Sequence, residues 1–189
     1  MLDDDLQRLG GGLIVRHARA AEELPRLAAE LGVQAVFLNH DGEPQALVRD
    51  ARVADQLRAQ GAALRSFKDH VIFERSEVLT AAGGAYGVFT PYKNAWLRKV
   101  NDFYLSSYPI DRHARALATT PLARGVPDLA DIGFEPVTLS PHLGLGSRGA
   151  ESLLADFLDR IDAYDRQRDF PAVKGPSYLS VHLRFGTIS

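Results

Sequence analysis

The N-terminal third of the chain alternates between short runs typical of strands and longer segments with the apolar spacing of helices. One of these runs, Gln34–Leu38, is continuously apolar, as in strands that are buried on both faces of a parallel sheet. This alternation predicts parallel strands joined by crossover helices, and therefore an α/β fold with a doubly wound sheet. Glycines follow both helical segments, where glycine commonly ends a helix. The predicted elements are strands at Gly12–His17, Gln34–Leu38 and Ala63–Phe67, and helices at Ala20–Leu31, ended by Gly32, and from Pro44, ended by Gly61.

Polar side chains follow the second predicted strand, at Asn39, His40, Asp41 and Glu43. Ligands of open α/β sheets bind outside the carboxyl ends of the strands, so these residues are candidates for a small-molecule site. A polar loop without a ligand is the alternative interpretation.

From Asp69 onward the periodicity weakens into a long connection. Ala81–Gly87 (AAGGAYG) predicts a turn, and Thr90-Pro91 predicts the start of a helix over Tyr92–Ser106. We expect the aromatic residues of that helix to pack in a core rather than to stack on a ligand or carry electrons. These residues are Trp96, Phe103 and Tyr104. The proline-rich segment Pro109–Pro141 is predicted to be a linker.

The segment GLGSRG, Gly144–Gly149, matches the G-x-G-x-x-G pattern of dinucleotide-binding folds. That mechanism needs a strand before the glycines and another after the following helix. Ser140-Pro141-His142 precedes the motif and Arg168–Pro171 follows the helix, so neither strand is predicted. We therefore interpret the glycines as a flexible entry to a helix.

The C-terminal segment carries a second candidate site. Apolar residues within Asp156–Asp165 recur at helical spacing, and Pro171 with Gly175-Pro176 then interrupts the helix. Ser177 and Ser180 place hydroxyl groups where a new helix is expected to begin. Backbone N–H groups and hydroxyls at such a position suit a phosphate, although an ordinary N-cap is the alternative.

The composition excludes several classes of protein. The 189 residues include 22 Lys and Arg against 24 Asp and Glu, so no overall basic charge points to nucleic acid. A local basic cluster near the C-terminus is either a DNA contact or a solvated face, and comprises Arg166, Arg168, Lys174, His182 and Arg184.

The chain has no cysteine, which fits a reducing cytoplasm, and no apolar run of about 18 residues that could span a membrane. The acidic N-terminus, MLDDDLQRLGGG, lacks the apolar core of a secretory signal and is predicted to be part of a helix. No metal-ligand or nucleophile-elbow spacing is present, so no metal site and no catalytic residue is predicted.

Two blocks of sequence point to a particular protein family, which the physical patterns described above do not. RDFPAVKGPSYLSVHLRFGTIS, residues 168–189, resembles the segment that opens the FAD-binding domain of DNA photolyases and cryptochromes. FKDHVIFERSEVLTAAGGAYGVFTPYKNAWL, residues 67–97, resembles the join after the antenna domain of that family. The resemblance implies a partial α/β antenna domain at residues 1–71, an interdomain segment at 72–145, and the first helices of an all-α FAD-binding domain at 146–189.

The resemblance also assigns roles to single residues. Tyr164 matches a tyrosine that lies against the flavin, and Arg168 matches an arginine that contacts DNA phosphates. The family's five-residue phosphate-contacting segment corresponds to Pro176, Ser177, Tyr178, Leu179 and Ser180. Pro176 stands where threonine is common, which removes one hydroxyl and one N–H donor. Val181 stands where proline is common.

The implied activity is that of a deoxyribodipyrimidine photo-lyase, a carbon–carbon lyase. Excited reduced FAD passes an electron to a cyclobutane pyrimidine dimer that is flipped out of damaged DNA, and the dimer splits. A cryptochrome-like blue-light photoreceptor and a stand-alone nucleotide-binding module are the alternatives. Gln45 and Ala46 stand where folate-binding members have an Asn-Glu pair, so a folate antenna is not expected, and a deazaflavin, another flavin or no antenna stays open. We expect a cytoplasmic monomer.

The resemblance further implies that two strands of the family's sheet precede this chain. On its own, the chain is then expected to add Gly12–His17 to the other two strands in a three-stranded sheet, or to aggregate. We also expect the isolated chain to be marginally stable and catalytically inactive.

Overall fold

The computed structural model describes residues 2–122, 125–135, 137–138 and 143–188. The chain divides into two compact units, Gln7–Gly125 and Met1–Leu6 together with Val126–Ser189. The chain begins with helix α1, Leu2–Arg8, where the sequence predicts a helix. The predicted boundaries at residues 71 and 145 stay predictions.

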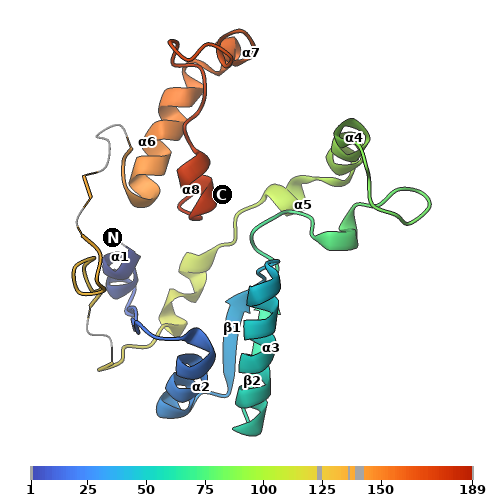
Figure 1. Cartoon of the computed structure of the whole chain (residues 1–189). Coiled ribbons are helices and arrows are strands. Elements are labelled where there is room, and N and C mark those ends of the chain that lie inside the picture. Colours follow the sequence, from blue (N-terminus) through green and yellow to red (C-terminus); the bar gives the residue numbers. More distant parts are fainter. Residues whose placement is uncertain (1, 123–124, 136, 139–142, 189) are drawn as a thin grey trace. The chain divides into compact units, whose positions relative to one another are not determined.

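The first unit contains a parallel two-stranded sheet covered by helices (Figure 1). Its elements are α2 (Ala20–Leu31), β1 (Ala35–Asn39), α3 (Pro44–Ala59) and β2 (Ala63–Phe67). In the register of the sheet, Ala35 pairs with Ala63 and Asn39 with Phe67, so both strands end at the same edge. The predicted α/β class is confirmed.

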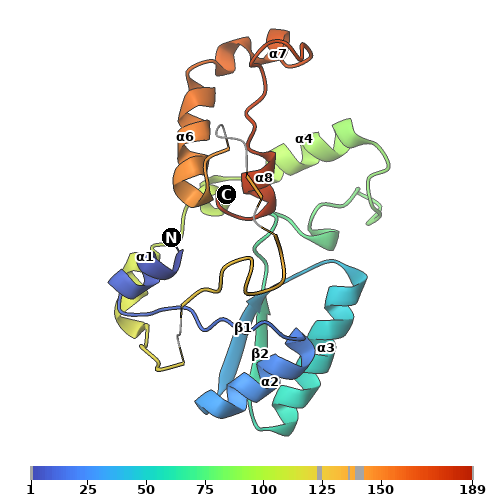
Figure 2. The same cartoon turned by 60° about the vertical axis from the view of Figure 1, so that its left-hand side comes forward.

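The core of this unit forms where α2 and α3 pack together beside the strands (Figure 2). Val53 and Leu57 of α3 are completely buried, and Ala28 of α2 completes the buried cluster. Gly32 ends α2 with a φ of 62°, and its N–H donates to the carbonyl of Ala29. This left-handed conformation explains why glycine stands at that position.

The predicted strand Gly12–His17 is wrong, because that segment forms no strand and the sheet has only β1 and β2. The three-stranded sheet, one of the two expected outcomes, is therefore wrong as well, and aggregation stays a prediction. The segment is instead held beside α2 by Arg16, whose guanidinium lies 3.3 Å from the carboxylates of both Glu23 and Glu30. An apolar run predicts burial, but a strand also needs a neighbour that matches its backbone hydrogen bonds.

The segment after β2 is built from short helices. It contains a 3₁₀ turn at Arg75–Glu77, α4 (Phe89–Lys99), α5 (Asp102–Leu105) and a 3₁₀ turn at Ile110–Ala116. The turn predicted at Ala81–Gly87 is present, with Gly83 at a φ of 78°. Part of the predicted linker lies outside the described residues, including Pro136 and Pro141.

The helix predicted over Tyr92–Ser106 is in fact two helices. It begins at Phe89, before the Thr90-Pro91 pair, and α4 ends at Lys99. Asn101 is fully extended, and its side-chain oxygen accepts the N–H of Phe103 at 3.1 Å. Asparagine competes with helical hydrogen bonding in this way, so a second helix starts there.

Trp96, Phe103 and Tyr104 were predicted to pack in a core, and this prediction is wrong for Phe103. Trp96 and Tyr104 are half-buried against Phe73, at ring separations of 5.7 and 4.8 Å. Phe103, however, is 80% exposed.

The second unit contains α6 (Gly146–Leu158), a 3₁₀ turn at Ile161–Ala163, α7 (Tyr164–Gln167) and α8 (Ser180–Arg184). Figures 1 and 2 both show α6 and α8 side by side. The continuous helix predicted over Asp156–Asp165 is wrong, because α6 ends at Leu158 and Arg160 leaves the helical conformation with φ −131° and ψ 7°. None of the described helices has the length and apolar content needed to cross a bilayer.

The glycines of GLGSRG pack at the entry to α6. A Cβ on Gly149 would lie 2.2 Å from the carbonyl carbon of Gly144, and a Cβ on Gly144 would lie 2.6 Å from the Cα of Gly149. The two backbones therefore touch where α6 begins. The predicted helix entry is present, and its flexibility stays a prediction. Ser140 to His142, where the preceding strand was predicted to be missing, lie outside the described residues.

Candidate functional site

The candidate site is the turn that leads into α8, from Lys174 to Ser180. Gly175 is buried, Pro176 and Ser177 are half-buried, and Tyr178 and Ser180 are exposed. Tyr178 has a φ of 58°, a left-handed conformation that is uncommon for a residue with a bulky side chain. Such strained conformations cluster at binding sites, where the surrounding structure holds them in place.

The turn presents backbone donors that the described part of the chain leaves unused. The N–H groups of Ser177, Tyr178 and Ser180 have no acceptor among the described residues. The N–H of Leu179 is directed to the hydroxyl of Ser177 at 3.4 Å, and the Leu179 side chain is buried. Leu179 therefore anchors the turn, while its neighbours offer donors to a ligand.

The ordinary N-cap interpretation does not fit this geometry. Helix α8 begins at Ser180, and its N-cap is Leu179, which makes no side-chain cap. Since neither serine caps the helix, their local backbone is free to serve an anion. Helix α8 has only five residues, too few for its dipole alone to define an anion site.

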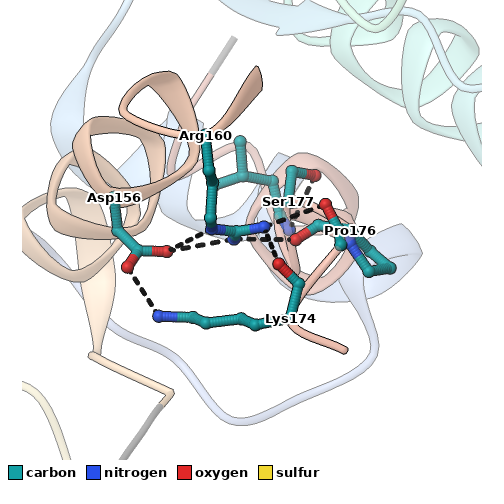
Figure 3. A network of polar contacts seen from close by, with 7 residues as sticks. Asp156, Arg160, Lys174, Pro176 and Ser177 are labelled. Atoms are coloured by element: carbon teal, nitrogen blue, oxygen red, sulfur yellow. Dashed lines mark hydrogen bonds and ion pairs between the residues drawn. The ribbon is translucent and has the colours of Figure 1, made fainter. Parts of the chain in front are cut away.

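One side chain joins the end of α6 to the turn (Figure 3). Arg160 donates from its two terminal nitrogens to the carbonyls of Lys174, Gly175 and Pro176, with N···O distances of 2.9 Å to the last two. It also donates to Asp156 Oδ2 at 3.0 and 3.2 Å. Lys174 Nζ donates to the other oxygen of Asp156 at 2.5 Å, which closes the network.

Two cations of this network share one carboxylate. The Lys174 ammonium, followed by the Arg160 guanidinium, lowers the pKa of Asp156 below its ordinary value. Asp156 therefore stays ionised at neutral pH and holds both cations in place. No pattern in the turn itself points to Arg160; the available signal was the i,i+4 spacing of Asp156 and Arg160 before a Gly-Pro break.

Two further predicted site residues lie in the same unit. The Tyr164 ring contacts Phe157 edge-on at 5.7 Å, and the Arg168 guanidinium lies over Tyr164 at 5.6 Å. The Arg160 guanidinium lies 5.3 Å from the Phe157 ring and 6.0 Å from the Tyr178 ring. Aromatic and cationic contacts thus run from Tyr164 to the turn.

The predicted basic cluster is only partly a surface feature. Arg166 and Arg168 are exposed and pair weakly with neighbouring aspartates, at 3.8 and 3.7 Å. Lys174 is engaged by Asp156, and His182 is buried, with its Nδ1 2.8 Å from the Thr187 hydroxyl. His182 is therefore no part of a surface cluster.

A separate pocket lies at the carboxyl ends of β1 and β2. His40 and Asp41 contribute to it, whereas Asn39 donates to Asp69 at 2.9 Å. The N–H of Glu43 donates to Asp41 at 3.0 Å. The full lining is His40, Asp41, Leu47, Asp50, Ala51, Ala54, Leu64, Ser66 and Arg75. The described residues hold no cluster of His, Asp and Glu fit for a metal ion.

A family model described as DNA photolyase matches residues 1–113, more than half of the chain. This chain belongs to the DNA photolyase family. The match confirms the resemblance that the two sequence blocks predicted. The family generally binds FAD and a second, light-harvesting chromophore, and its photolyases repair DNA.

Relatives and solved structures of the family cover nearly the whole chain. A deoxyribodipyrimidine photo-lyase of Halobacterium salinarum is 40% identical over 186 residues, which make up 95% of this chain and 37% of the relative. Cryptochrome-1 of Arabidopsis thaliana is 27% identical over 202 residues, covering all of this chain and 28% of the relative. A class III photolyase of Agrobacterium tumefaciens superposes with a TM-score of 0.81 at 29% identity, over 100% of this chain and 39% of that one. The chain thus spans less than half the length of the photolyases it matches.

Proposed function

We propose that a photolyase containing this chain binds FAD through the turn at Pro176–Ser180 and repairs cyclobutane pyrimidine dimers in light. The observation that carries this proposal is the set of unused N–H donors on Ser177, Tyr178 and Ser180. Successive backbone N–H groups bind phosphate oxygens well, so the donor set fits the pyrophosphate of FAD. Membership of the photolyase family supports the same ligand.

In this proposal some residues of the turn contact the ligand and others hold the turn in place. Ser177, Tyr178 and Ser180 donate N–H groups to the pyrophosphate, while Leu179 holds the turn in the core of the unit. Pro176 has no N–H, unlike the threonine that is common at this position. In its place, the N–H groups of Ser177, Tyr178 and Ser180 supply the hydrogen-bond donors. When bound, reduced FAD supplies the light-driven electron.

Tyr164 and Arg168 act beside the turn in this proposal. Tyr164 is 38% exposed, which leaves part of its ring available to pack against the flavin. The Arg168 side chain is 52% exposed, and within the described part of the chain it forms a long ion pair with Asp169, at 3.7 Å. It is therefore available to neutralise a DNA phosphate.

We also assign the antenna chromophore to the pocket at the carboxyl ends of β1 and β2. His40 and Asp41 give this pocket polar groups beside apolar residues of α3, a combination that suits a ring system with a polar edge. Because Gln45 and Ala46 replace the Asn-Glu pair of folate-binding members, a flavin or deazaflavin fits better than a folate.

A cryptochrome-like photoreceptor is the second candidate. The similarity to Cryptochrome-1 over the whole chain favours it, since that relative shares the same segment. Both candidates require FAD, so flavin binding does not separate them. Repair of DNA does.

A chimera tests the proposal. This chain replaces the matching segment of the Halobacterium salinarum photo-lyase, and the unmodified relative serves as control. We expect about one FAD per chimera and loss of dimers from irradiated DNA in light but not in the dark. A chimera that folds without FAD would refute the proposal, and one that binds FAD without repair would favour the photoreceptor.

A further inference from the structure

Three consecutive backbone carbonyls converge on a single side chain at the start of the candidate turn. The carbonyls of Lys174, Gly175 and Pro176 all accept hydrogen bonds from the Arg160 guanidinium (Figure 3). Consecutive carbonyls of an extended chain point in alternating directions. Three consecutive carbonyls can therefore point to one side chain only where the backbone departs from the extended conformation. Arg160 thus stabilises one conformation of this segment.

The guanidinium has no donor left for a ligand. Arginine carries five N–H donors, and Arg160 makes five hydrogen bonds, three to the carbonyls and two to Asp156. Its side chain is only 18% exposed. A direct hydrogen bond from Arg160 to a bound anion would therefore require the loss of one of these five contacts.

The orientation of one peptide group links Arg160 to the proposed donors. In a trans peptide the C=O and the following N–H point in opposite directions. Because the Pro176 carbonyl points to Arg160 Nη2 at 2.9 Å, the N–H of Ser177 points away from Arg160. The side chain thereby sets the direction of the first donor in the turn.

Two further contacts limit the freedom of the same segment. The backbone of Gly175 lies against that of Gln167 and Arg168, where an added Cβ would fall 2.6–2.8 Å from their atoms. Lys174 is tied to Asp156, the same carboxylate that pairs with Arg160. Rotation of the turn would break these contacts together.

We infer that Arg160 is a positioning residue that presents the N–H groups of Ser177–Ser180 to an anionic group. This inference rests on the proposed function, since it names the residue that preorganises the proposed phosphate-binding turn. Preorganisation raises affinity by lowering the ordering cost of binding. The arginine fork is needed for this role, because lysine keeps the charge but cannot reach three carbonyls in fixed geometry.

The test compares Arg160→Leu and Arg160→Lys in the full 189-residue chain, with Arg166→Leu as the matched control. Arg166 is an exposed arginine nearby that pairs only with Asp165 in the described structure. Backbone ¹⁵N order parameters of residues 175–180 report the turn itself. FAD and riboflavin titrations report phosphate binding, since riboflavin has no phosphate.

We expect order parameters near 0.85 in the unmodified chain and in Arg166→Leu, and values below about 0.6 in both Arg160 variants. FAD affinity should fall about tenfold in the Arg160 variants, while riboflavin affinity stays unchanged. An ordered turn in both Arg160 variants would overturn the inference, as would a disordered turn with unchanged FAD affinity. If the unmodified chain shows no FAD binding, the proposed flavin site fails, and the order parameters still decide whether Arg160 positions the turn.

Discussion

Replacement of Gly175 by alanine would place a methyl group against backbone atoms. The new Cβ would lie 2.6 Å from the carbonyl oxygen of Gln167, 2.7 Å from its carbonyl carbon and 2.8 Å from the Arg168 nitrogen. Backbone atoms cannot rotate away as the end of a side chain can. The turn must therefore move from α7.

The size of the effect follows from this crowding. Excess methyl groups in well-packed sites cost about 1–3 kcal/mol, and the displacement also strains the Arg160 contacts to the same segment. A loss of about 1–3 kcal/mol raises the open population of the turn roughly 5–150-fold. We expect amide hydrogen exchange over residues 164–184 to increase by that factor in Gly175→Ala.

The assay has a matched control and an internal one. Gly87→Ala adds a methyl group where nothing lies within 4 Å, so its exchange should match that of the unmodified chain. Trp96, the single tryptophan, lies in the other unit, so its fluorescence melt should be unchanged in both variants. Unchanged exchange over residues 164–184 in Gly175→Ala would refute the packing argument.

Three other predictions concern the same unit. Asp156→Asn should be less stable than the unmodified chain at neutral pH, because Lys174 and Arg160 lower the pKa of Asp156. The difference in free energy of unfolding should persist above the carboxyl pKa of the unfolded chain and vanish as the pH falls through the lower pKa of the folded chain. Denaturant melts that give the same difference at every pH would contradict this. In the chimera, Arg168→Ala should weaken DNA binding and reduce the salt dependence by about one counterion without changing flavin content, and an unchanged salt slope would remove Arg168 from the phosphate contacts. The isolated chain should lose FAD during purification, because it supplies a phosphate turn without a full ring pocket, and a visible spectrum with about one flavin per chain would disprove this.

Much of the first unit could be predicted because its signals are local. Pro44, an apolar stripe that includes Leu57, and a final glycine define α3 from neighbouring residues alone. The stripe predicted at Leu47, Val48, Ala51, Ala54 and Leu57 is wrong in part, because Val48 is exposed and the buried Val53 was not in it. The strand β1, Ala35–Asn39, lies within one residue of the apolar run predicted at Gln34–Leu38. Gly12–His17 has the same kind of run and forms no strand, because pairing depends on residues distant in the sequence.

The candidate site was predictable only as a segment. Family resemblance identified Pro176–Ser180, but the support for this turn comes from Arg160, at the interruption of a predicted continuous helix. Helical periodicity across Asp156–Asp165 concealed that interruption, since apolar spacing records burial and not the path of the backbone. The sequence predicts Gly175 to interrupt a helix, whereas the close contact of its backbone with that of Gln167 explains why glycine stands there.

The most direct test of the phosphate turn is an amide chemical-shift titration of the 189-residue chain with FAD, ADP and riboflavin. The N–H groups of Ser177, Tyr178 and Ser180 have no acceptor among the described residues, so a bound phosphate should shift these three signals most. We predict saturable shifts at the three positions with FAD and ADP, and none with riboflavin. Shifts confined to other residues, or equal shifts with riboflavin, would contradict the account.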